Sequence, residues 1–140
     1  MSSPLVVKYN KDFQPRMYLY LDTVPSSLFH TASTQCIDLN KLEDFAISGF
    51  MRGTYEMSPH LAMTDTFFCG HIQGVNHIPM SDAFIASYDS SGAYKWSFCK
   101  RDGDRSNSSL HAIIDEESNV YAFTDFRDSV NYDPNNIRSP

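Results

Sequence analysis

The chain has 140 residues and a net charge of −6, with 17 acidic and 11 basic side chains. This length suits one domain with a buried core, and 41% hydrophobic against 20% charged residues excludes a disordered composition. No apolar run approaches the ~20 residues of a membrane-spanning helix. No basic cluster that would bind phosphate backbones stands out beyond Lys100-Arg101. We therefore expect neither membrane insertion nor nucleic-acid binding.

The predicted elements are short strands separated by polar turns, because no window has the 3.6-residue apolar period of a helix. Strands are predicted, in chain order, near residues 5–9, 17–20, 45–50, 66–69, 84–88, 94–98 and 120–123. Turns are predicted at residues 10–13, 38–41, 89–92 and 115–119. A polar loop is expected over 101–109. Strands with turn signals this closely spaced are typical of a sandwich, a barrel or a propeller.

The second half of the chain repeats the first. Five blocks recur in the same order at separations of 75 to 79 residues. The first-copy blocks are residues 5–10, 17–20, 37–38, 45–50 and 53–59, and their counterparts are 84–89, 96–99, 114–115, 121–126 and 128–134. The sequence therefore predicts a single all-β domain, residues 1–140. Within it, 4–59 is copy one, 60–82 a connecting segment, 83–134 copy two and 135–140 a tail.

The second copy resembles the bacterial and archaeal β-propeller repeat family. The resemblance rests on the Tyr88-Asp89-Ser90-Ser91-Gly92 turn followed by Trp96, on Asn119-Val120-Tyr121, and on the closing Asp133-Pro134. The first copy departs from the pattern, with Met17 in place of the Trp. The resemblance implies antiparallel four-stranded blades and a secreted or cell-surface location, although the chain begins without a signal peptide. Its core and turn positions here are Tyr9, Tyr88, Asp89, Gly92, Trp96, Asp115, Tyr121, Phe126, Pro59 and Pro134.

The phase of this repeat predicts how the blades are divided. Residues 35–100 would form one whole blade, 4–21 the second half of a preceding blade and 110–132 the first half of a following one. The chain would hold about two blade equivalents, too few to close a ring of four to eight blades. We therefore expect a homo-oligomer, with the end of one chain completing the start of the next in a ring or filament. The alternative is a fragment of a longer propeller protein.

Candidate chemical sites are few. Cys69, His71 and His77, with His60 nearby, are zinc-ligand types, but their spacing matches no standard zinc site. Asp102, Asp104 and Asn107 lack the spacing of a calcium loop. No nucleophile elbow, zinc-protease helix or phosphate loop occurs, so we expect no catalytic residues, no metal and no cofactor.

Three cysteines, Cys36, Cys69 and Cys99, lie far apart and are expected to be buried free thiols, the alternative being one disulfide in an oxidising compartment. The function expected is a non-enzymatic binding or scaffolding module for its own copies or a protein partner. The alternative is a lectin-like carbohydrate-binding module, since the chain is rich in Tyr and Phe. Because Met17 replaces Trp96 in the other copy, that position is interpreted as core rather than as a sugar-stacking site.

Overall fold

The computed structural model describes residues 5–23, 31–57, 65–73, 78–100 and 110–124. Within these ranges every regular element is a strand and every strand pair is antiparallel, which confirms the predicted all-β class. The strands are β1 (Leu5–Tyr9), β2 (Pro15–Tyr20), β3 (Asp22–Thr23), β4 (Thr31–Leu39), β5 (Phe45–Glu56), β6 (Thr66–Cys69), β7 (His71–Gln73), β8 (Ile78–Met80), β9 (Asp82–Tyr88), β10 (Tyr94–Lys100), β11 (Leu110–Ile114) and β12 (Val120–Thr124).

Four strands form the central sheet, in the order β4-β5-β9-β10. β4–β5 and β9–β10 are hairpins, and β5 joins them by pairing with β9 from Phe45 opposite Tyr88 to Met51 opposite Asp82. The second half of β5 leaves this sheet and pairs with β6 and with the short β3. β6 lies where the sequence predicts an extra strand in the connecting segment. The same segment also contains the small β7–β8 hairpin.

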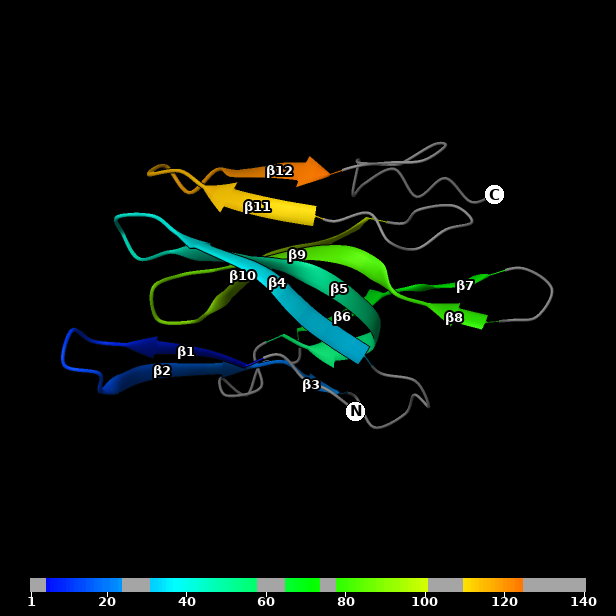
Figure 1. Ribbon diagram of the computed structural model, residues 1–140, viewed down its shortest axis with the longest axis horizontal. Helices are drawn as coiled ribbons and strands as arrows, with labels where there is room; N and C mark the ends of the chain where they lie inside the picture. The colour runs from blue at the N-terminus through cyan, green and yellow to red at the C-terminus, as the bar shows by residue number, and fades with distance from the viewer. Residues whose placement is uncertain (1–4, 24–30, 58–64, 74–77, 101–109, 125–140) are drawn as a thin grey trace.

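A separate two-stranded hairpin covers each face of the central sheet (Figure 1). β1–β2 lies on one side and β11–β12 on the other, so the molecule has three layers. Along β5 and β9 successive side chains point alternately toward the two outer layers, as the two-residue period of a strand requires. Phe45, Ile47, Phe84, Ala86 and Tyr88 pack in one cluster with Leu19 of β2. The intervening residues Ala46, Ala83 and Ile85 pack in a second cluster with Leu110, Ala112 and Ile114 of β11.

The hairpin turns of the three layers lie at the same end of the molecule, on the left in Figure 1. The turns predicted at residues 10–13, 89–92 and 115–119 are found there. The turn predicted at 38–41 is displaced, because Asp38 and Leu39 still pair with Ala46 and Phe45 and the chain turns only from Asn40. Asp38 remains in the ladder because its carboxylate accepts a hydrogen bond from the Ile114 amide, 2.8 Å away on β11.

Candidate functional site

Four turns at residues 10–14, 40–44, 89–93 and 115–119 share one geometry and together form what we call the turn end. In each, the side-chain oxygen of the first residue accepts hydrogen bonds from the amides two and four positions later. Asn and Asp favour such turns because their short side chains reach the backbone. The first residues are Asn10, Asn40, Asp89 and Asp115. The fourth residues have positive φ: Phe13 (58°), Glu43 (65°), Gly92 (86°) and Ser118 (65°).

Asp44 joins three of these turns. Its carboxylate accepts hydrogen bonds from the Ser90 amide, at 3.1 Å, and from the Ser118 hydroxyl, at 2.8 Å, and it forms an ion pair with Lys95. The hydrogen bond from Lys95, followed by that from Ser118, holds the pKa of Asp44 below its usual 3.8. The carboxylate is therefore charged at neutral pH and ties the central sheet to β11–β12.

Further polar contacts link the layers at the turn end. Asn40 donates its amide hydrogens to the Asp115 carbonyl, at 3.0 Å, and to Ser118. Ion pairs join Lys8 to Glu43 and Lys41 to Glu116, so all three layers are connected. Such exposed pairs contribute little to stability individually.

The turn carboxylates have the environment of structural groups. The side-chain hydrogen bond from Asn119 is the largest cause of the lowered pKa of Asp115, and Tyr121 donates a further bond. Burial raises the pKa of Asp89, but hydrogen bonds from Ser91 and Ala93 outweigh it and leave that pKa lowered. Among the described residues no group of three or more His, Cys, Asp or Glu side chains could hold a metal ion.

The two outer faces of the molecule are apolar. On β1–β2, Leu5 opposite Tyr20 and Tyr18 opposite Val7 lie on the side away from the central sheet, and Leu5 is 61% and Tyr18 56% exposed. On β11–β12, Ile113 lies opposite Tyr121, and Phe123, opposite His111, is 58% exposed. We call these two surfaces the β1–β2 outer face and the β11–β12 outer face.

The strands that the structure describes cover each face of the central sheet over only part of its width. β11 packs against β4 and β5, and Trp96 of β10, on the same side of the sheet, is left 39% exposed. On the other side β1–β2 leaves Ile37 and Leu39 of β4 exposed, although the residues opposite them, Ile47 and Phe45, are buried. Large apolar patches of this kind on a folded protein usually mark contact surfaces.

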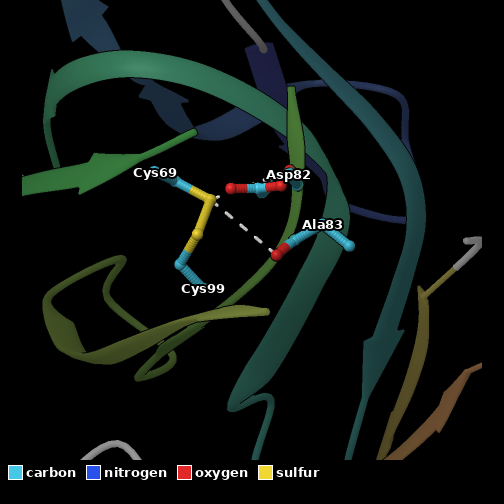
Figure 2. The surroundings of a disulfide bond; sticks show 4 residues. All are labelled: Cys69, Asp82, Ala83 and Cys99. Carbon is cyan, nitrogen blue, oxygen red and sulfur yellow. Dashed lines mark hydrogen bonds between the residues drawn. A yellow bond between two sulfur atoms is a disulfide. The ribbon is translucent and has the colours of Figure 1, made fainter. Parts of the chain in front are cut away.

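Cys69 and Cys99 form a disulfide that ties β6 to β10, with Cα atoms 5.5 Å apart. Figure 2 shows the bond beside Asp82 and Ala83 at the start of β9; the Cys69 sulfur lies 3.7 Å from the Asp82 carbonyl oxygen. The expectation of three free thiols was therefore wrong for two of them. The bond forms because β6 and β10 bring together cysteines 30 residues apart in the sequence, which their spacing does not predict. Only Cys36 is a free thiol, and it contacts the Ala112 carbonyl.

The residues predicted as core and turn positions of the repeat differ in burial and in role in the structure. Tyr88 is fully buried against Phe45, and burial strongly raises its pKa, whereas its counterpart Tyr9 is exposed. Trp96 was interpreted as core but lies partly exposed, because no strand among the described residues covers it on this side. Asp89 and Asp115 begin turns, Gly92 has positive φ, and Tyr121 lies on the β11–β12 outer face. Pro59, Phe126 and Pro134 lie outside the described residues.

The other chemical candidates of the sequence do not assemble into a described site. The sulfur of Cys69 is in the disulfide, so it cannot serve as the zinc ligand considered above. His60, His77, Asp102, Asp104 and Asn107 lie outside the described residues. Sequence reasoning expected apolar faces at the two ends but did not identify their side chains, although β1 carried a signal for them. Leu5-Val6-Val7 is apolar at consecutive positions, a pattern typical of strands buried on both faces.

Comparison of the chain with protein-family models, with curated proteins and with solved structures gave no match. In the described part of the chain no helix is long and apolar enough to cross a membrane.

Proposed function

We propose that the chain is a non-enzymatic, propeller-like binding or scaffolding module that associates with its own copies through its terminal hairpins. The observation that carries the proposal is the pair of apolar outer faces on β1–β2 and β11–β12. Covering such side chains is worth about 1.5–3 kcal/mol for each one fully buried. In the described part of the isolated chain these side chains stay exposed on both sides, so this free energy is not gained.

The strand arrangement supports the propeller-like reading. A four-stranded antiparallel sheet occupies residues 31–100, and hairpins within 5–20 and 110–124 stack on its opposite faces. These are the positions at which the repeat predicts one whole blade and two half-blades. Propeller blades are four-stranded sheets arranged around an axis, so each two-stranded hairpin would need a second hairpin to complete a blade. A contact between different surfaces on identical chains closes into a ring or continues as a filament.

The disulfide supports the secreted or cell-surface location that the family resemblance implies. Disulfides persist in oxidising compartments and are rare in the cytosol. The Cys69–Cys99 bond joins a fully buried residue of β6 to a partly buried residue of β10, as a structural rather than a catalytic disulfide does.

The native mass in solution tests the proposal. Size-exclusion chromatography with light scattering should give a multiple of 15.9 kDa that falls toward the monomer on dilution. A mass of 15.9 kDa at every concentration would refute self-association. It would favour the alternative, in which these residues are part of a longer propeller chain whose further segments cover the outer faces.

One observation favours a second function, carbohydrate binding. Trp96 is partly exposed and directly follows Lys95, which forms an ion pair with Asp44 at the turn end. An exposed aromatic ring near polar side chains is a common element of sugar recognition. A glycan array tests this function: sugars bound by the wild-type chain and lost by Trp96→Ala would support it, and an array without hits would leave the scaffold proposal.

A further inference from the structure

Among the described strands, β1 and β12 each have one unpaired edge. In the described part of the chain β1 pairs only with β2, and β12 only with β11. The strands in the corresponding places of the central sheet, β9 and β5, pair with each other as well as with their hairpin partners. A free strand edge presents unpaired N–H and C=O groups and is a template for another strand.

The turn geometry shows which residues correspond. Asn10 and Asp89 begin identical turns, and both hairpins skip one residue after the turn, Arg16 in β2 and Lys95 in β10. β1–β2 therefore has the same form as β9–β10. Asn40 and Asp115, 75 residues apart, begin the other two turns. β11–β12 thus corresponds to β4–β5 at a separation of 75 residues. The sequence blocks in this part of the repeat are separated by 76 or 77 residues, so the turns shift their alignment by one or two residues.

We propose that β12 of one chain pairs with β1 of the next in the register of β5 and β9, so that the two hairpins form a second four-stranded sheet. This inference rests on the proposed self-association and specifies its contact. Phe45 opposes Tyr88 in the central sheet. In the composite sheet the corresponding residues place Val120 opposite Tyr9 of the next chain.

The faces of the two hairpins agree with this register. Continuing along the strands, Ala122 opposes Val7, and Tyr121 opposes Lys8. Side chains that oppose each other in a sheet share a face. Val120 and Ala122 are directed toward their own central sheet, and Tyr9 and Val7 of the next chain are directed away from theirs. All four therefore face the central sheet of the chain that supplies β12. A slip of one residue would place every side chain of β1 on the opposite face. The turns define this register independently of the directions of the side chains, and the two agree.

The composite sheet covers the exposed halves of both central sheets. The β1–β2 outer face, with Tyr9 and Tyr18, would lie over Trp96 of the preceding chain. The β11–β12 outer face, with Tyr121 and Phe123, would lie over Ile37 and Leu39 of the following chain. Ten of the thirteen large apolar side chains that are exposed in the described residues belong to these surfaces. They are Leu5, Tyr9, Tyr18, Tyr20, Ile37, Leu39, Trp96, Ile113, Tyr121 and Phe123.

Charge also favours this partner. The β1–β2 hairpin carries Lys8, Lys11 and Arg16 against a single acid, Asp12, whereas the β11–β12 turn carries Asp115, Glu116 and Glu117. Complementary charge steers association and disfavours contacts between like surfaces. A second copy that brings its basic hairpin to this acidic turn therefore satisfies both the apolar faces and the charges.

Cysteine pairs test the register. Val7→Cys with Ala122→Cys, and Lys8→Cys with Tyr121→Cys, are in-register pairs, and consecutive pairs sample both types of antiparallel spacing. The same four substitutions recombined, Val7→Cys with Tyr121→Cys and Lys8→Cys with Ala122→Cys, are matched controls displaced by one residue. Cys36, the free thiol, is replaced by serine in all four variants. Within one chain the central sheet separates the two hairpins, so a bond between the two introduced cysteines must join different chains.

On oxidation with diamide, at least one in-register pair should give disulfide-linked multimers on a non-reducing gel, at least tenfold more than either recombined control. Equal or stronger linkage in the controls, or no linkage in any pair, would overturn the register. The native mass of the unsubstituted chain, measured on the same preparation, separates the two proposals. An oligomer without in-register linkage refutes the composite sheet alone, and a monomer refutes both.

Discussion

Replacing Leu19 with alanine should release the β1–β2 hairpin from the central sheet without unfolding that sheet. In the described residues no backbone ladder joins the hairpin to the central sheet, so side chains hold it there. Leu19 is the fully buried member, at 1% exposure, with Val6 and Met17 partly buried beside it. The ion pair of Lys8 with Glu43 is exposed and worth about 0–1 kcal/mol. Beyond the hairpin, Leu21 and β3 keep the following residues anchored to β5.

The loss expected from Leu19→Ala is about 2–5 kcal/mol, the range for removing a buried leucine side chain. A hairpin on its own is marginally stable at best, so this loss should detach it. Hydrogen exchange, at a concentration where the chain is monomeric, should show faster exchange for residues 5–20 and unchanged protection in β5 and β9. Leu42→Ala is the matched control, because Leu42 is exposed in a turn and its loss should change stability by less than about 0.5 kcal/mol. Uniformly faster exchange in all strands would refute the reasoning, as would an effect of Leu19→Ala no larger than the control's.

Two further predictions concern the turn end. At Gly92, where φ is 86°, substitution by alanine should destabilise the chain by about 1 kcal/mol or more. Phe13→Gly, at the corresponding position with φ 58°, should be neutral or stabilising in the same urea titration, because glycine removes the steric cost of positive φ. The pKa of Asp44 is lowered by Lys95 and Ser118, so its contribution to stability is present above the unfolded pKa, near 3.8, and is lost as pH falls through the folded value. Asp44→Asn should flatten the pH dependence of urea unfolding below pH 4; a wild-type slope in this variant would contradict the assignment.

The sequence predicted the elements whose signals are local. Alternating apolar residues and Asx or Gly turns located the hairpins, and the turn beginning at Asp89 was placed correctly. The start of the turn at Asn40 was misplaced because Asp38 has the same turn propensity, and only its contact with the Ile114 amide keeps it in the strand. The Cys69–Cys99 bond and the partial exposure of Trp96 depend on which strands become neighbours, and pattern reasoning does not contain that information.

The candidate site was predicted less well than the fold. The repeat suggested incomplete blades at both ends, but it did not identify the side chains that an association would bury. These side chains follow from knowing which residues of β1 and β12 face outward, and that depends on a register correct to one residue. Tyr9 and Tyr88 occupy corresponding positions in the sequence, yet only the structure shows that one is covered and the other is not.

The measurement that tests the central claim most directly is the native mass of two variants, alone and mixed. Tyr18→Glu places a charge on the β1–β2 outer face, and Phe123→Glu places one on the β11–β12 outer face; both positions are exposed, so each variant should fold. Each variant alone should have the monomer mass of about 15.9 kDa, because one side of every contact is defective. An equimolar mixture should form a one-to-one dimer, since each chain retains the face that the other needs. A mixture that remains monomeric, or a single variant that assembles as the wild type does, would contradict the head-to-tail account.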